Sequence, residues 1–394
     1  MKSEWQTVRA ADFMDFNPRL SIKKGTVATK ISMDKLRPFT KVVPSVEQAE
    51  FSGGTKFANG DTIMARITPC LENGKTAFVD CLKENEIAFG STEFIVLRAK
   101  PGVSDSQFVY YLATSPEFRN VAIKSMVGSS GRQRVQQLVL ENLELTVPKL
   151  PEQEKIGRFL AELDDKIALN ERVNDNLEQQ AATYFQELFI NNANPVWQIS
   201  TISDLGTVVG GSTPSKTKPE YYTNNGIAWI TPKDLSINKS KFISHGENDI
   251  TELGLKNSSA TVMPKGTVLF SSRAPIGYIA IASNEVTTNQ GFKSVIPYSE
   301  IGTAFVYFFL KHSLPVIESA ASGSTFKEIS GSAMKNIPAI IPDRNTLDQF
   351  NSFCAPIFAQ QKILEEQNHS LAMLRDSLLP KLMSGAIDIA SIQL

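Results

Sequence analysis

The chain repeats itself, and this internal repeat constrains its fold more than any other feature of the sequence. Residues 4–13, EWQTVRAADF, return as VWQISTISDL at 196–205. Residues 108–118, FVYYLATSPEF, return as FVYFFLKHSLPVI at 305–317, and a glycine-serine turn follows each copy, GSSGRQR at 128–134 and GSTFKE at 323–328. Because a repeat of this length indicates a duplicated domain, the 394 residues are predicted to form two copies of one fold.

Short strand-forming segments fill most of each copy. The first contains TIMARI, TAFVD and EFIVLR, and the second contains TVLFSS, YIAIAS and FKSVI. Gly, Pro and Asn residues separate these segments, as they do in sheets joined by tight turns. We therefore expect each copy to begin with a compact mixed domain of strands and a few helices.

The end of each copy has the spacing of one long helix. Apolar and amide residues recur there at alternating steps of four and three, the pattern of a coiled-coil seam. Both seams keep one offset of 194 residues, so the two helices are expected to pack together in a shared register. The first seam is Ile156, Leu160, Leu163, Ile167, Asn170, Asn174, Leu177, Ala181, Tyr184 and Leu188, and the second is Phe350, Cys354, Ile357, Gln361, Leu364, Asn368, Leu371, Arg375, Leu378 and Leu382.

The asparagines and the prolines of these helices lead to separate predictions. Asn174 and Asn368 match across the copies, and an asparagine in a seam fixes register at a cost in stability; the alternative is that both face solvent. Pro356 and Pro380 lie inside the second helix and are predicted to kink or restart it.

These patterns predict four segments. Residues 1–150 form the first mixed domain and residues 151–192 the central helical region. Residues 193–343 form the second mixed domain and residues 344–394 the C-terminal helical region.

Local charge is more informative than the net charge of −1, which argues against a uniformly basic nucleic-acid binder. Residues 21–41 carry six basic residues against one acidic residue, whereas residues 152–189 carry nine acidic residues against four basic ones. The alternation suits a chain whose globular parts contact a polyanion and whose helices contact protein.

Several functional classes are disfavoured. Cys70, Cys81 and Cys354 lack metal-ligand spacing and are interpreted as small, mostly buried thiols, so no metal site is predicted. The sequence has no run of 18 apolar residues and its first residues do not resemble a signal peptide, which predicts a soluble cytoplasmic protein.

One stretch nearly matches a phosphate-binding loop. GGSTPSKTKPEYY, at 210–222, fits G-x-x-x-x-G-K-[ST] except that Ser215 replaces the second glycine. Pro214 removes a backbone donor, and the following residues suggest a turn where a nucleotide-binding loop needs a helix. The stretch is therefore interpreted as a DNA-contacting loop, with an ordinary polar surface loop as the alternative.

The order of these features resembles the specificity subunit of type I restriction-modification enzymes. The segments that carry the resemblance are GDTIMARITPCLENGKTAF and FGSTEFIVLRAK in the first copy and GGSTPSKTKPEYY and GIAWITPKDL in the second. The helical segment beginning PEQEKIGRFLAELDDKIALNERV is similar to the family's central helical region. The resemblance covers essentially the whole chain. It implies an α+β fold, in which two tandem target-recognition domains are separated by two long helices packed as an antiparallel coiled coil with pseudo-two-fold symmetry.

The family also implies a function and partners. Such a subunit catalyses nothing; it binds an asymmetric bipartite site on double-stranded DNA. It positions two methyltransferase subunits and, in the full enzyme, two restriction subunits. The [DN]-P-P-[YF] motif of adenine methyltransferases is missing, because Asn17-Pro18 continues as Arg19-Leu20. S-adenosylmethionine and ATP are therefore expected on the partners and no cofactor on this chain.

Candidate DNA contacts are polar or basic side chains in these segments, since Lys and Arg neutralise phosphates while Arg and amides read base edges. Taken singly, each is more often structural than specific. In the first copy they are Lys23, Lys24, Arg66, Asn73, Lys75, Thr92, Arg132, Gln133 and Arg134. In the second they are Ser212, Thr213, Ser215, Lys216, Lys218, Lys233, Ser272, Arg273, Asn289, Gln290 and Lys327.

The acidic helices are expected to bind the methyltransferase, through Glu171, Asp175 and Glu178. A different class of protein also fits the pattern. Duplicated strand-rich modules on helices could form a protein-binding scaffold without DNA recognition, and salt-dependent binding of duplex DNA distinguishes the two.

Overall fold

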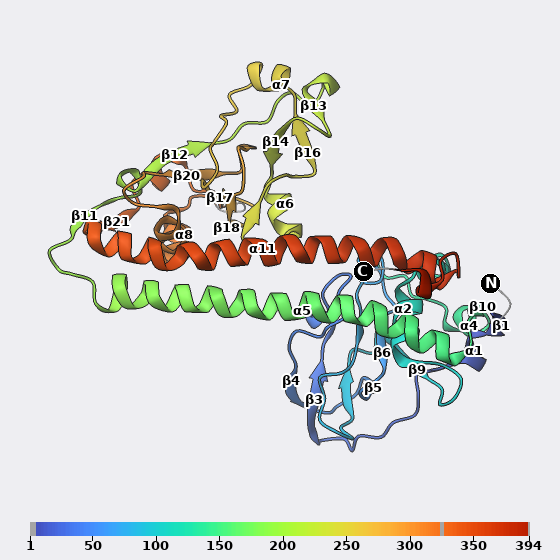
Figure 1. Ribbon diagram of the computed structural model, residues 1–394. Helices are drawn as coiled ribbons and strands as arrows, with labels where there is room; N and C mark the ends of the chain where they lie inside the picture. The colour runs from blue at the N-terminus through green and yellow to red at the C-terminus, as the bar shows by residue number, and fades with distance from the viewer. Residues whose placement is uncertain (1–4, 324–326, 393–394) are drawn as a thin grey trace. The chain divides into compact units, whose positions relative to one another are not determined.

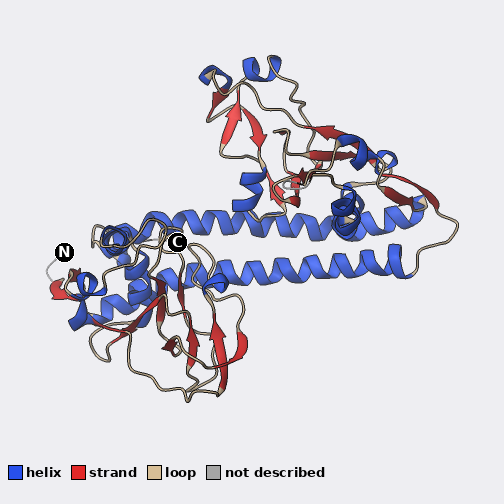
Figure 2. Cartoon of the chain, turned by 180° about the vertical axis from the view of Figure 1, so that it is seen from behind, coloured by secondary structure: helices blue, strands red, loops and turns tan. Residues whose placement is uncertain are grey.

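A computed structural model describes residues 5–323 and 327–392 and divides the chain into two compact units (Figure 1). Unit 1 comprises Met1–Leu169 with Gln367–Leu394, and unit 2 comprises Asn170–Glu366. Two long helices, α5 (Leu150–Gln186) and α11 (Arg344–Met383), each contribute residues to both units. Strands and short helices make up the remainder of each unit (Figure 2).

Unit 1 contains two four-stranded sheets with orders β2-β9-β6-β7 and β4-β3-β8-β5, and a two-stranded sheet β1-β10. Its strands are β1 (Gln6–Arg9), β2 (Met14–Phe16), β3 (Val27–Ile31), β4 (Glu47–Glu50), β5 (Thr55–Phe57), β6 (Thr62–Ala65), β7 (Thr76–Phe78), β8 (Ala88–Gly90), β9 (Phe94–Ala99) and β10 (Glu144–Val147). Its shorter helices are α1 (Ala10–Phe13), α2 (Ser106–Thr114), α3 (Pro116–Lys124) and α4 (Gln137–Glu141), with a 3-10 turn at Met33–Lys35.

Unit 2 contains a five-stranded sheet β12-β20-β17-β18-β15, a four-stranded sheet β13-β16-β14-β19 and the pair β11-β21. Its strands are β11 (Gln198–Thr201), β12 (Gly206–Gly210), β13 (Tyr222–Thr223), β14 (Ile227–Ile230), β15 (Phe242–Ile243), β16 (Asn248–Ile250), β17 (Val268–Ser272), β18 (Ile276–Ala282), β19 (Thr287–Thr288), β20 (Lys293–Pro297) and β21 (Pro338–Ile341). Its shorter helices are α6 (Pro232–Ile237), α7 (Glu252–Lys256), α8 (Thr303–His312), α9 (Leu314–Ala320) and α10 (Gly331–Lys335). Pro219–Tyr221 and Ile202–Asp204 form 3-10 turns.

The predicted repeat is confirmed in the strand pairing. In unit 1, β1 runs antiparallel to β10 with Gln6 opposite Val147. In unit 2, β11 runs antiparallel to β21 with Gln198 opposite Ile341. The same sequence positions therefore close each domain in the same register, and the expected α+β class with two mixed domains and two long helices is confirmed.

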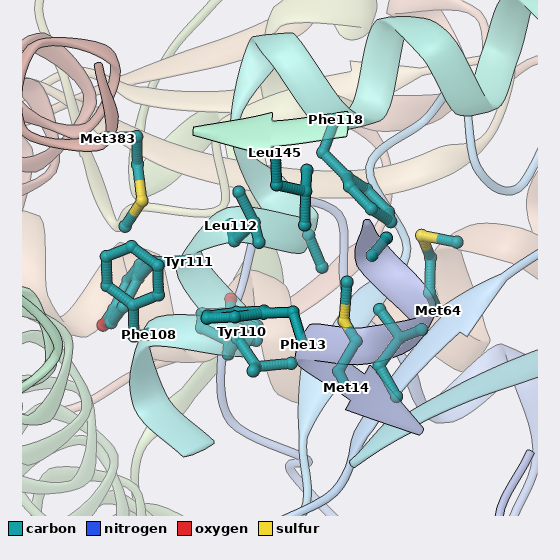
Figure 3. Packing of buried hydrophobic residues seen from close by; sticks show 14 of the residues in the cluster. Phe13, Met14, Met64, Phe108, Tyr110, Tyr111, Leu112, Phe118, Leu145 and Met383 are labelled. Carbon is teal, nitrogen blue, oxygen red and sulfur yellow. The ribbon is translucent and has the colours of Figure 1, made fainter. Parts of the chain in front are cut away.

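Apolar helices fill the core of each unit. Their sequence supplies both a capping residue at the N-terminus and apolar side chains that are buried. In unit 1, α2 begins where Asp105 accepts a hydrogen bond from the N–H of Phe108 at 2.8 Å, and Phe108 and Tyr111 are buried. Figure 3 shows these side chains packed around Phe13, with Met383 of α11 in the same cluster. The C-terminal end of α11 is therefore part of the unit 1 core.

In unit 2 the corresponding core is rich in aromatic rings. Phe185 of α5 lies 5.8 Å from Phe305 of α8 and 5.7 Å from Phe350 of α11, measured between ring centroids. One helix of the mixed domain therefore packs on both long helices within this unit.

Within each unit the two long helices pack antiparallel. In unit 1, Asp164 pairs with Arg375, while Ile167 farther along α5 accepts from Asn368 at 3.3 Å. In unit 2, the Asn174 carbonyl accepts from Gln361 at 3.1 Å. Ten residues further, the Tyr184 hydroxyl accepts from Gln349 at 2.6 Å. No seam position that the sequence predicts is solvent-exposed, so the predicted seam is confirmed.

The predicted restart of the second helix is wrong. The chain from Arg344 to Met383 is one helix that includes Pro356 and Pro380. Each proline removes one backbone donor, but Leu378, Leu379 and Leu382 beside the second are buried, and their packing holds the turn in place. Tertiary contacts therefore outweigh the local preference here.

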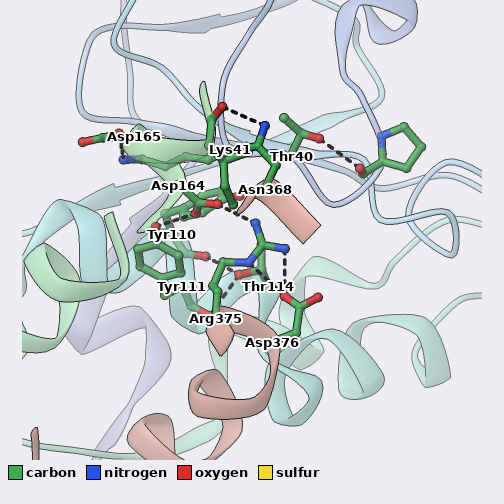
Figure 4. Close-up of polar contacts among 12 residues, drawn as sticks. Thr40, Lys41, Tyr110, Tyr111, Thr114, Asp164, Asp165, Asn368, Arg375 and Asp376 are labelled. Carbon is green, nitrogen blue, oxygen red and sulfur yellow. Dashed lines mark hydrogen bonds and ion pairs between the residues drawn. The ribbon is translucent and has the colours of Figure 1, made fainter. Parts of the chain in front are cut away.

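A buried ionic network ties unit 1 together (Figure 4). Asp164, whose side chain is 5% exposed, pairs with Arg375 at 2.5 Å and accepts from the Tyr111 hydroxyl at 2.6 Å. Burial works to lower the pKa of Arg375, but the adjacent Asp164 and Asp376 outweigh it and raise the pKa. Lys41 is also buried and pairs with Asp165 at 3.1 Å, so this lysine of the predicted basic stretch is used inside the fold.

Unit 2 has a network of its own around Lys241. Its ammonium group contacts Glu178 and Gln361 and lies 4.1 Å from the ring centre of Phe358. Burial lowers the pKa of Lys241. Glu365 of α11 accepts the backbone N–H of Lys241 at 2.7 Å, so one strand end is fastened to both long helices of the unit.

Two further sequence expectations bear on function. Cys354 is buried and Cys70 is half-buried, but Cys81 is exposed, contrary to the expectation for all three. No group of residues suited to a metal ion occurs in the part of the chain that the structure describes. Within those same residues, no helix combines the length and apolar character needed to cross a bilayer.

Candidate nucleic-acid interface

In unit 1 the candidate site is built where three loops meet beyond β6. Backbone hydrogen bonds join the three loops. The Arg66 N–H donates to the Glu93 carbonyl at 2.9 Å, the Thr68 N–H to the Gln133 carbonyl at 3.0 Å, and the Val135 N–H to the Arg66 carbonyl at 2.8 Å. The loop at 128–135 is therefore held against the end of β6 and the turn before β9. Four predicted contacts, Arg66, Gln133, Arg134 and Thr92, are brought together in this way.

Arg134 is the most strongly organised of these residues. Its guanidinium donates to Glu93 at 2.6 Å and 3.0 Å, while 45% of its side chain stays exposed. The hydrogen bond from Arg134 holds the pKa of Glu93 below its ordinary value, so the pair is ionised at neutral pH. Arg66 is directed differently, because its guanidinium donates to the Val135 carbonyl at 3.2 Å.

The other unit 1 candidates are less tightly grouped. Arg132 and Asn73 are exposed, and Lys23 and Lys24 are exposed in a separate turn before β3. Lys75 is half-buried and donates to the Met33 carbonyl at 2.9 Å, so its ammonium group is held by the domain.

In unit 2 an equivalent frame forms beyond β17. The Ser272 N–H donates to the Gly291 carbonyl at 2.8 Å, and the Ile329 N–H donates to the Ser272 carbonyl at 3.1 Å. The Ser272 side chain is fully buried, which leaves Arg273 to face outward from this turn.

The glycine-rich stretch packs against this frame. Ser212 N–H donates to Thr288 at 2.9 Å, and the Thr213 hydroxyl donates to the Gln290 amide oxygen. A side chain at Gly211 would come within 2.1 Å of the Asn289 carbonyl, so only glycine permits this approach. Ser212, Thr213, Asn289 and Gln290 therefore share one surface.

The rest of the stretch is a polar turn. Ser215 and Thr217 share a hydrogen bond at 2.9 Å, and the Lys218 ammonium donates to the Tyr221 hydroxyl at 3.1 Å. Ser215, Lys216 and Lys218 are exposed. A short 3-10 turn follows at Pro219–Tyr221, in the place where a nucleotide-binding loop would have an α-helix.

The remaining unit 2 candidates carry charge at the edges of the site. Arg273 pairs with Glu328 at 3.3 Å, and Lys293 of β20 approaches the same carboxylate at 3.6 Å. Lys233 pairs with Glu247 at 2.6 Å, and Lys327 is exposed. Residues 324–326 of the turn GSTFKE lie outside the described residues.

Sequence reasoning missed the ion pairs of both sites. Glu328 and Lys293 were not predicted, and the pairing of Glu93 with Arg134 was not foreseen. A signal was present, since Arg134 and Glu328 occupy the same place in the two repeat copies with opposite charge. Opposite charges at two equivalent positions on candidate DNA-binding loops indicate that each position has a different ion-pair partner.

The three acidic residues expected to bind a protein partner differ in exposure. Asp175 and Glu171 are exposed on α5. Glu178 faces the interior of unit 2, where its carboxylate contacts Lys241, Lys311 and the Tyr307 hydroxyl. Burial works to raise the pKa of Glu178, but the two lysines outweigh it and lower the pKa. Glu178 therefore has an internal role that its position in the acidic helix did not reveal.

Comparison with known proteins places this architecture in a family. The model of the type I restriction modification DNA specificity domain matches twice, at residues 2–179 and 195–368. The two matches cover most of the chain and coincide with its two repeat copies.

Two curated relatives extend the comparison. The MjaIX specificity subunit of Methanocaldococcus jannaschii is 43% identical over 162 residues, which are 41% of this chain and 37% of that protein. The HindI specificity subunit of Haemophilus influenzae is 24% identical over 407 residues, covering 83% of this chain and 86% of that protein.

A solved structure shows the same fold. The S subunit of a type I restriction-modification system from M. genitalium aligns with a TM-score of 0.56 over 96% of each chain, at 17% identity. The arrangement of two mixed domains and two long helices is therefore shared at low sequence identity.

Proposed function

The chain belongs to the family of type I restriction-modification DNA specificity proteins, and from this premise we propose how its two domains work. Each mixed domain recognises one half of a bipartite DNA site, and the chain itself carries no catalytic centre. The observation that carries the proposal is the duplication of one backbone frame with different exposed side chains, because two different half-sites need such an arrangement.

In this proposal the recognised site is asymmetric. The polar loop of unit 2 at Ser212–Lys218 and the arginine loop of unit 1 at 131–134 have different chemistry. Hydroxyl groups and lysines bind phosphates, while paired arginine and amide groups suit base edges. Non-identical loops therefore select non-identical half-sites.

The partners would supply the chemistry. Two methyltransferase subunits would bind the chain together with S-adenosylmethionine, and restriction subunits would bring ATP-dependent activity, in a cytoplasmic complex. The exposed residues Glu171 and Asp175 are the first candidates for the methyltransferase contact. Glu178 is set apart from them, because reversing its charge would also break contacts within unit 2.

Duplex binding at increasing salt tests the proposal. The full chain, with any subunit that co-purifies, is titrated with a labelled random-sequence duplex. DNA recognition predicts that the logarithm of the association constant falls linearly with the logarithm of the salt concentration. Binding that is absent at all salt concentrations would favour the scaffold alternative.

A matched pair of variants separates assembly from DNA binding. Asp175→Lys is expected to reduce co-purification of the methyltransferase while leaving DNA binding by the isolated chain unchanged. Glu252→Lys, an exposed acidic residue of α7, is the control and should co-purify normally. Equal loss of assembly in both variants would remove α5 from the proposed contact.

A further inference from the structure

Positions 134 and 328 are structural equivalents. Arg134 forms antiparallel bridges with Ile67 and Val127, and Glu328 forms the corresponding bridges with Arg273 and Ser322. The residue that follows donates its N–H to a carbonyl at the end of the equivalent strand: Arg66, directly after β6, in unit 1, and Ser272, the last residue of β17, in unit 2. The two side chains therefore leave the same backbone frame at the same place.

The charges at these equivalent positions are opposite, and each is compensated from a different strand. Arg134 is paired with Glu93, which precedes β9. Glu328 is paired with Arg273, which follows β17, and with Lys293 of β20. The bridges and strand pairings place Ile67 and Ile95 of unit 1 at the positions of Arg273 and Lys293, so the compensating charges come from different positions in each unit.

Compensation makes both positions poor phosphate contacts. A guanidinium already bonded to a carboxylate gains little Coulomb attraction from a phosphate, and Glu328 would be repelled by one. Both side chains nevertheless stay accessible, with 45% of Arg134 and 37% of Glu328 exposed. Arginine has five N–H donors and a carboxylate has about four acceptor sites, so each keeps hydrogen-bonding capacity beyond its ion pair.

These observations point to base edges as the ligand. Paired with a carboxylate, a guanidinium is fixed in orientation, which suits bidentate donation to the O6 and N7 atoms of guanine. A carboxylate held by basic neighbours can accept from the exocyclic N4 amino group of cytosine, the base contact typical of Glu.

We propose that Arg134 and Glu328 are equivalent base-reading residues with opposite preference. Arg134 selects guanine at one position of the half-site read by unit 1, and Glu328 selects cytosine at one position of the half-site read by unit 2. Glu93, Arg273 and Lys293 are positioning residues for these two. The inference rests on the proposed function, because it assigns bases to domains already proposed to bind DNA.

Arg132 is the useful contrast within the same loop. It is exposed, and within the described ranges no carboxylate pairs with it. An unpaired arginine keeps its full attraction for phosphate, so Arg132 is a phosphate contact while Arg134, two residues away, reads a base.

Selection from a randomised duplex library tests the proposal. The full chain, in complex with the subunits that co-purify with it, is used to enrich bound sequences, and the enriched motif is compared among variants. Arg134→Gln should change one guanine in one half-site to adenine, because glutamine pairs with the N6 and N7 atoms of adenine. Glu328→Gln should remove a cytosine preference of about 5- to 150-fold in the other half-site.

Each variant carries its own folding control, since the half-site read by the other unit should be enriched as in the wild type. Glu84→Gln in unit 1 and Glu300→Gln in unit 2 remove exposed carboxylates outside the two frames and should leave the motif unchanged. Arg132→Gln should weaken binding to all sequences and lower the salt slope by about one.

The outcomes distinguish the base-reading role of these two residues from DNA recognition by the chain. An unchanged motif in both Arg134→Gln and Glu328→Gln, with wild-type enrichment intact, overturns the base-reading assignment and leaves DNA recognition standing. A uniform loss of affinity in Arg134→Gln makes that residue a phosphate contact and likewise overturns it. A wild-type complex that enriches no sequence contradicts the proposed function itself.

Discussion

Unit 1 and unit 2 use the same backbone frame for their candidate contact residues, but they reverse the charge it presents. The frame consists of backbone hydrogen bonds and buried strands. Its exposed positions can therefore carry many different side chains without a change in the backbone. Arg134 and Glu328 are accessible at its tip, and in the role we propose a substitution there would change recognition at little cost in stability. The comparison indicates how one duplicated domain can acquire two specificities.

The buried networks of the two units differ in another way. In unit 1 the central group is a carboxylate, Asp164, that binds a guanidinium and a phenol. In unit 2 it is an ammonium group, Lys241, that binds a carboxylate and an amide. A buried charge must keep its partners, so these residues tolerate substitution far less than the exposed tips do.

The largest expected effect is in unit 1. Asp164→Ala leaves Arg375 buried without its main partner and removes the acceptor for Tyr111, so the free energy of unfolding should fall by about 3–5 kcal/mol. Urea denaturation followed by circular dichroism measures this change. Glu162→Ala, an exposed position on the same helix, should change it by less than about 0.5 kcal/mol. Equal effects would mean that the ionic network does not stabilise the unit.

Removal of the unit 2 ammonium group should have a smaller effect. Lys241→Met loses the contact of the ammonium group with the Phe358 ring but leaves an apolar side chain in its place, and Glu178 retains Lys311 and the Tyr307 hydroxyl as partners. We expect a loss of about 1–3 kcal/mol. Hydrogen exchange should show the loss in α8 and β15, with Lys256→Met as the exposed control. Faster exchange in α2 of unit 1 alone would contradict this assignment.

Sequence patterns predicted the parts of this comparison that depend on periodicity. The seams, the strand-rich domains and the matching ends of the two copies follow from burial at regular spacing, which the sequence displays directly. The site depended on contacts between distant loops. Glu93 and Arg134 are 41 residues apart, and no local rule joins them. The internal role of Glu178 was hidden for the same reason, because Lys241 comes from another element.

The smallest expected effect concerns the seam asparagines, which also differ between the units. The Asn174 side-chain oxygen in unit 2 is buried and has no hydrogen-bond partner among the described residues, whereas Asn368 in unit 1 donates to the Ile167 carbonyl. Asn174→Leu should therefore raise the stability by about 1 kcal/mol, and Asn368→Leu should leave it nearly unchanged. Thermal melting compares the two variants. A lower melting temperature for Asn174→Leu would show that its amide is needed in the seam.

The central claim is that each unit reads its own half-site, and exchanging one mixed domain tests it most directly. Residues 1–150 are replaced by the corresponding segment of a relative whose recognised site is known. The bound motif is then determined by selection from a randomised duplex library. The account predicts that one half of the motif changes to that of the relative, while the half read by unit 2 stays the same. A motif that changes in both halves, or in neither, would contradict it.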